Sequence, residues 1–138
     1  MTQSTPAGEP ALRQITLYEA IGGEPTVDRL TRRFYELMDT LPEAAACRAI
    51  HPESLEGSRE KLFMYLTGWL GGPQLFVQKH GAPMLRARHL PFSIAEEERD
   101  GWLVCFNQAL DETVANERVR EMIRENVTKL GYHMQNRT

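Results

Sequence analysis

The sequence predicts an all-α protein, and three observations support this fold class. Apolar residues recur at intervals of three and four along most of the chain, as they do on one face of a helix. Capping residues, glycines and prolines divide the chain into segments of helical length. The alternation of apolar and polar residues that is typical of a β-strand does not occur. We therefore expect four main helices and two short ones.

The composition is that of one soluble globular domain. Of 138 residues, 41% are hydrophobic and 25% are charged, which suits a single hydrophobic core. Residues 1–14 are rich in Pro, Gly, Ser and Thr, so we expect a flexible tail before a domain over residues 15–138. The formal net charge of −3 argues against a nucleic-acid partner, which usually requires a basic surface.

The sequence also favours a cytoplasmic location. No apolar run approaches the roughly 18 residues of a membrane span, and the amino terminus lacks the pattern of a signal peptide. The two cysteines form no CxxC pair and are too few for a disulfide framework. We expect Cys105 to be a buried apolar residue, and Cys47, which follows three alanines, to be more accessible.

The first helices are marked by capping and breaking residues. Thr16 and Glu19 have the spacing of a capping box, which predicts a short helix ended by residues 22–23, both glycines. Pro25 suits the first turn of the next helix, which residues 41–42 (Leu-Pro) should end. The predicted apolar face of this helix comprises Val27, Leu30, Phe34, Leu37 and Met38.

A longer helix is expected after an alanine-rich corner and the pair His51-Pro52. It should run to about Leu70 and stop at residues 71–73, which read Gly-Gly-Pro. Its apolar face comprises Leu55, Leu62, Leu66 and Trp69, with Tyr65 beside them. Residues 74–82 show no clear period and predict a loop.

The second half begins with a short helix that Pro83 can start and Pro91 must end, carrying Met84, Leu85 and His89. Ser93 and Glu96 have the spacing of a second capping box. The helix it opens should turn inward Ile94, Trp102, Phe106, Ala109 and Leu110. Asn116 should cap the last helix, whose apolar face comprises Val119, Met122, Ile123, Val127 and Leu130.

His89 is the main candidate for chemistry, because it stands at a helix end beside Arg86 and Arg88. The helix dipole alone favours a histidine there, so a purely structural role is one interpretation. Haem iron takes a neutral imidazole as axial ligand, and the other ring N–H needs an acceptor such as the carbonyl of Leu85. The arginines could pair with the two haem propionates, with Arg88 the first choice because helical geometry points the two in different directions.

Three aromatic side chains with polar tips could form the opposite wall of such a site. They are Tyr35 on the second helix, His51 at the corner and Trp102 on the inward face of a later helix. Each also has a structural interpretation: a core tyrosine bonded to a carbonyl, a cap or surface histidine, and a large core filler.

The ordered series of motifs resembles the truncated haemoglobins, specifically those of group II. The matching segments follow the family's order over about residues 16–130. They are LYEAIGG at 17–23, RFY at 33–35, IHP at 50–52, WLGGP at 69–73, RARHLPF at 86–92 and RDGWL at 99–103.

This resemblance implies a two-over-two helical sandwich around haem b, with His89 as the proximal iron ligand. It also implies that Tyr35 and Trp102 donate hydrogen bonds to the distal ligand and that His51, at a corner position of the same pocket, could be a third donor. Ser58 falls where many globins place a histidine or glutamine, and Leu62 should lie over the distal face. Tyr65, Leu66 and Phe92 are expected haem contacts. Phe76 replaces a tyrosine that approaches a propionate in many relatives, so the arginines should matter more.

A pentacoordinate haem protein that binds O2, NO or CO is the leading functional hypothesis. Donors aimed at bound O2 slow its release, which favours redox or detoxification chemistry over oxygen transport. A peroxidase or nitric oxide dioxygenase is the alternative, and it would need a separate reductase because the chain has no flavin or nicotinamide motif. A more distant alternative is a helical interaction module that binds no haem. Monomer and homodimer both remain open.

Overall fold

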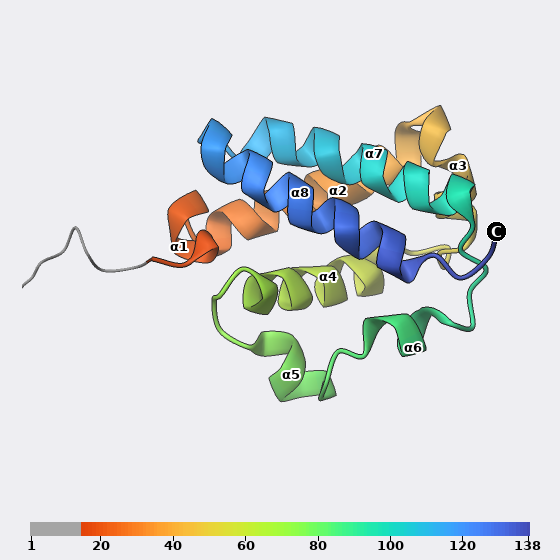
Figure 1. Ribbon diagram of the computed structural model, residues 1–138, viewed down its shortest axis with the longest axis horizontal. Helices are drawn as coiled ribbons and strands as arrows, with labels where there is room; N and C mark the ends of the chain where they lie inside the picture. Colours follow the sequence, from red (N-terminus) through yellow and green to blue (C-terminus); the bar gives the residue numbers. More distant parts are fainter. Residues whose placement is uncertain (1–14) are drawn as a thin grey trace, which may run out of the picture.

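The computed structural model describes residues 15–138, so the tail predicted for residues 1–14 lies outside the described part. All regular structure in this part is helical (Figure 1). The elements in chain order are α1 (Leu17–Ile21), α2 (Glu24–Thr40), the 3-10 helix η2 (Pro42–Ala44), α3 (Ala45–Ala49), α4 (Glu56–Trp69), α5 (Leu75–His80), α6 (Leu85–His89), α7 (Glu96–Thr113) and α8 (Glu117–Met134).

The four long helices form two pairs. Helix α2 packs against α4 and α7, and α7 packs against α8. Figure 1 shows α7 and α8 side by side, with α4 below them and the short helices α5 and α6 beyond α4. This is the two-over-two arrangement that the sequence predicts. None of the described helices has the length and apolar character needed to cross a membrane.

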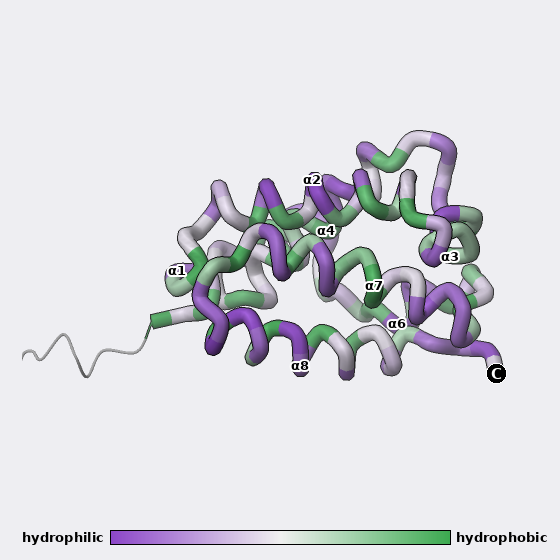
Figure 2. Tube along the Cα trace, turned by 90° about the horizontal axis from the view of Figure 1, so that it is seen from above, coloured by the Kyte–Doolittle hydropathy of each residue, from purple (hydrophilic) through white to green (hydrophobic). Residues whose placement is uncertain are grey.

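The core forms where the apolar faces of α2, α7 and α8 meet. Figure 2 shows hydrophobic and hydrophilic residues alternating along these helices with helical period. All five predicted core residues of α2 are buried, and Phe34 and Phe106 are fully buried. Burying a side chain of this size contributes about 1.5–3 kcal/mol. The aromatic centre of the core therefore fixes α2 against α7.

The predicted helix caps are confirmed at three places. The Thr16 hydroxyl accepts from Glu19 N at 3.0 Å, and the Glu19 carboxylate accepts from Thr16 N at 3.1 Å. Gly22 ends α1 with φ 109°, a left-handed conformation that glycine adopts without strain. Asn116 caps α8, its side-chain oxygen accepting from Val119 N at 3.0 Å.

Two segments contain helices that the sequence analysis did not predict. The expected loop at residues 74–82 is wrong in its centre, because α5 occupies residues 75–80. The alanine-rich corner contains η2 and α3. Helices of five or six residues have little stability of their own. They persist here because they pack on long helices, α5 on α4 and α3 on α7.

The start of α7 also differs from the prediction. The capping box expected at Ser93 and Glu96 is wrong: the cap residue is Ala95, whose N–H donates to the Glu98 carboxylate at 2.7 Å. Ile94 is buried as expected, but it precedes the helix. On α8, Met122 is 48% exposed, so its predicted place on the buried face is wrong.

Candidate functional site

His89 ends α6 and is held in one orientation. Its Nδ1 lies 2.8 Å from the carbonyl oxygen of Leu85, the hydrogen bond that the sequence predicts. A carbonyl oxygen can only accept, so Nδ1 carries the proton. In the neutral ring Nε2 then has a free lone pair. The half-buried imidazole therefore has the form that an axial iron ligand needs.

Tyr35 lies on α2 with its side chain buried and its hydroxyl unpaired. The residue is 8% exposed, and burial raises the pKa of its phenol far above the usual value of 10.0, so it stays protonated. The hydroxyl makes no hydrogen bond to any residue between 15 and 138, and the carbonyl partner of a structural core tyrosine is therefore not seen. This hydroxyl is thus suited to a ligand.

Trp102 is fixed by aromatic contacts across the core. Its ring stacks on Phe106, with centroids 5.4 Å apart and planes at 8°, and meets the edge of Phe34 at 5.3 Å. Phe34 in turn contacts Tyr35 at 4.7 Å. The indole N–H of the half-buried Trp102 has no hydrogen-bond partner in the described part of the chain. Two unpaired donors therefore flank one aromatic cluster.

His51 stands next to Tyr35, with ring centroids 6.0 Å apart. Its Nδ1 lies 2.8 Å from the carbonyl of Cys47 and must donate to it. Burial lowers the pKa of His51 below 6.5; the bond to the Cys47 carbonyl opposes this shift, and the positive charge of Arg48 adds to it. The neutral ring therefore presents Nε2 as an acceptor. In this tautomer His51 can donate through Nε2 only after gaining a proton.

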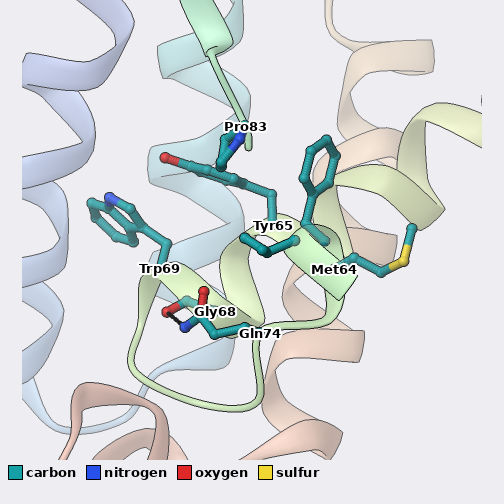
Figure 3. Close-up of a pocket in the computed structure, with 8 residues that line it drawn as sticks. Met64, Tyr65, Gly68, Trp69, Gln74 and Pro83 are labelled. Atoms are coloured by element: carbon teal, nitrogen blue, oxygen red, sulfur yellow. Dashed lines mark hydrogen bonds between the residues drawn. The ribbon is translucent and has the colours of Figure 1, made fainter. Parts of the chain in front are cut away.

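The residues expected along α4 separate into two groups. Leu66 is buried in the core, whereas Leu62 and Tyr65 are partly buried against it and Ser58 is half-buried. Tyr65 meets the edge of Phe76 at 6.2 Å, and both line a cavity of about 220 Å³ between α4 and α5. Figure 3 shows Tyr65 beneath Pro83 and the Gln74 amide bonded at Gly68. Tyr65 and Phe76 are thus brought together at one cavity.

The two arginines of α6 point in different directions, as helical geometry predicts. Arg88 donates to the carbonyls of Pro83 (2.6 Å) and His80 (2.9 Å), and its guanidinium lies 5.3 Å from the Phe76 ring centroid. Its Nη1 bonds to no described residue. Arg86 instead donates to backbone carbonyls near the carboxyl terminus. Arg88 is therefore the better placed of the two for an anionic group beside the cavity.

Both cysteines are free and buried, so the expected accessibility of Cys47 is wrong. Burial raises the pKa of Cys47 to about 12 and that of Cys105 to about 11. Helix α3 reaches α7 at Gly101, where an added Cβ would lie 3.3 Å from the Cβ of Cys47. This close packing covers the Cys47 thiol.

The sequence matches the bacterial-like globin family over residues 16–136. The chain belongs to this family. It is 40% identical over 121 residues to a group 2 truncated hemoglobin of Bacillus subtilis (strain 168), covering 88% of this chain and 89% of that protein.

Solved structures agree with this assignment. The group II 2-on-2 hemoglobin of Agrobacterium tumefaciens is 60% identical with a TM-score of 0.90, covering 91% of this chain and 98% of that one. The group II truncated hemoglobin of Bacillus anthracis is 39% identical with a TM-score of 0.83, covering 91% and 94%. This globin is therefore a group II truncated haemoglobin, a family that binds haem and small gaseous ligands.

The residues present fit a haem. His89 offers a free imidazole nitrogen, and Tyr35 presents an unpaired hydroxyl in a buried setting. A protonated His89 would lower the pKa of His51, so the two histidines lie close enough to interact. Phe92 follows His89 in the chain, with its ring centroid 6.4 Å from that of His89 and its side chain 44% exposed. An apolar macrocycle could cover this exposed ring.

Sequence reasoning missed two features of the site. The Cys47 carbonyl sets the tautomer of His51. This contact cannot be predicted from the sequence, because every residue has a carbonyl. Asn136, in the polar carboxyl-terminal segment, bonds to the backbone that follows His89. Only an alignment of homologues could have singled out an asparagine so distant in the chain.

Proposed function

We propose that this globin holds haem b through Nε2 of His89 and retains O2, or NO or CO, beneath Tyr35 and Trp102. The haem, when bound, supplies the iron at which a diatomic gas coordinates. The observation that carries the proposal is the Tyr35 side chain, which is only 8% exposed while its hydroxyl has no hydrogen-bond partner among residues 15–138. Leu62, Tyr65, Phe76 and Phe92 would supply apolar haem contacts, and Arg88 would pair with a propionate.

Retention of the ligand follows from the strength of the available hydrogen bonds. A hydrogen bond to a charged partner contributes about 1.5–3 kcal/mol, and about 1.4 kcal/mol changes an equilibrium tenfold. Tyr35 and Trp102 together would slow O2 release by roughly a hundredfold or more. Such slow release suits redox or detoxification chemistry better than transport.

The tautomer of His51 favours a second candidate function, a peroxidase. Its Nε2 accepts and its lowered pKa keeps the ring neutral near pH 7, so it can take a proton from hydrogen peroxide. The consumption of peroxide or of O2 with NO would need electrons from a separate reductase.

The proposal is tested by the rate of O2 dissociation in Tyr35→Phe and Trp102→Leu. We expect each variant to release O2 roughly tenfold faster or more, because each loses one donor. Tyr132→Phe is the matched control, since Tyr132 is 55% exposed and lies in the last turn of α8. Unchanged rates in both variants would contradict the proposal. Turnover of peroxide with a reductant, or of NO with a reductase, separates the enzyme from a simple ligand-binding protein.

A further inference from the structure

Hydrogen bonds connect the segment that carries His89 to the carboxyl-terminal residues of the protein. Within the described chain, every hydrogen bond from residues 85–94 to a partner more than ten positions away ends on residues 133–137. Arg86 donates to the carbonyls of His133 (2.6 Å) and Gln135 (2.8 Å). Ile94 exchanges bonds with Asn136. Figure 1 shows this end of the chain beside the α6–α7 connection.

Helix α6 needs such external support. It has five residues, too few for a helix that is stable in water by itself. Met84, Leu90 and Phe92 beside it are 65%, 50% and 44% exposed, so little apolar burial holds it in place. The bond between His89 and Leu85 orients the ring within α6 but not α6 within the molecule.

Asn136 makes the most concentrated set of these contacts. Its Nδ2 donates to the carbonyls of His89 (3.3 Å) and Phe92 (3.0 Å), and its Oδ1 accepts from Ile94 N (2.9 Å). Its own N–H donates to the Ile94 carbonyl at 2.8 Å. One side-chain amide thus fixes three backbone groups across the turn that follows the imidazole.

We propose that Asn136 is a positioning residue that sets the place of the proximal imidazole of His89. The proposal rests on the proposed role of His89 as iron ligand. Asn136 touches no reacting atom; it acts by fixing the backbone on the carboxyl side of His89. Arg86 supports it by holding the backbone at His133 and Gln135, immediately before Asn136.

The test uses haem-loaded Asn136→Ala and Asn136→Asp. The aspartate variant keeps an acceptor for Ile94 N but replaces both bonds to the carbonyls of His89 and Phe92 with repulsion between oxygens, whereas the alanine variant removes all the side-chain contacts without adding a charge. We expect a shifted and broadened iron–histidine stretching band in the resonance Raman spectrum of the ferrous protein. We also expect haem transfer to apomyoglobin to be roughly three- to tenfold faster. The C–O stretch of bound CO, which reports on the distal donors, should not change.

Asn126→Ala is the matched control, because the exposed Asn126 amide bonds, among residues 15–138, only to Met122 within α8. An iron–histidine band and haem-transfer rate in both Asn136 variants equal to those of this control would overturn the proposal. A change in the C–O stretch as large as the proximal change would also overturn it, since that indicates general loosening. If the wild-type protein shows no iron–histidine band at all, the proposed function fails first and this inference with it.

Discussion

The two walls of the proposed haem site are stabilised in different ways. The distal wall is built on the long helices α2 and α7, where Phe34 is fully buried and contacts both Tyr35 and Trp102. The proximal wall is the five-residue helix α6, with Phe92 44% exposed. Folding alone therefore fixes Tyr35 and Trp102, the proposed ligand donors, whereas His89, the proposed iron ligand, depends on a few polar contacts and on the cofactor. Ligand chemistry and haem retention should respond to different mutations.

Deleting one phenylalanine from each wall should show the largest contrast. Phe34→Ala removes a fully buried ring and should lower the free energy of unfolding by about 3–5 kcal/mol. Phe92→Ala removes an exposed ring and should lower it by less than about 1 kcal/mol. Urea denaturation of haem-free protein, followed by circular dichroism, measures both. Equal losses of unfolding free energy in the two variants would show that the two walls do not differ in how folding stabilises them.

Removing an arginine from each wall should have a smaller effect, on haem retention rather than on folding. Arg88→Met removes the guanidinium above Phe76 that we expect to pair with a propionate, and haem loss should become about fivefold faster. Arg33→Met is the control, because Arg33 lies on α2 and pairs with Glu112 at the surface. Stopped-flow transfer of haem to apomyoglobin gives both rates. An Arg88→Met rate no faster than that of the control would remove Arg88 from the proposed site.

The smallest effect concerns the protonation of His51 in the distal wall. Burial lowers the pKa of His51 in the folded protein below the value of 6.5 expected for the unfolded chain. At a pH between these two pKa values, the unfolded chain binds the proton more readily than the folded protein does. Stability should therefore fall as the pH falls below about 6.5, with a slope of at most about 1.4 kcal/mol per pH unit. Denaturation midpoints at pH 7.5, 6.5 and 5.5 test this. His51→Phe should flatten the slope and the exposed His133→Phe should not; identical slopes in all three proteins would contradict the assignment.

Local sequence patterns predicted most of the fold. The caps at Thr16 and Asn116 and the buried face of α2 follow from neighbouring residues, and the structure confirms them. Helices α3 and α5 were missed because packing on longer helices, and not their own periodicity, stabilises them. The start of α7 was misplaced because Ile94 is held by Asn136, a contact between residues 42 positions apart.

In the site, too, contacts between neighbouring residues were predictable and contacts between distant residues were not. The bond between His89 and Leu85 was predictable because both lie on one turn of a short helix. The tautomer of His51 depends on a carbonyl, and the contacts of Asn136 and Arg86 join residues 42–49 positions apart. Neither kind of contact produces a pattern in a single sequence. Motifs therefore predicted candidate residues for the site, while the structure was needed to assign donors and acceptors among them.

The most direct test of the account is the absorption spectrum of the purified protein titrated with haem, beside that of His89→Gly. The account predicts a stoichiometric haem spectrum for the wild type, with a ferrous form that binds O2. It predicts weak haem binding by His89→Gly, restored by free imidazole that replaces the missing ring. A wild-type protein that leaves the haem spectrum unchanged, or a His89→Gly variant indistinguishable from it, would contradict the account.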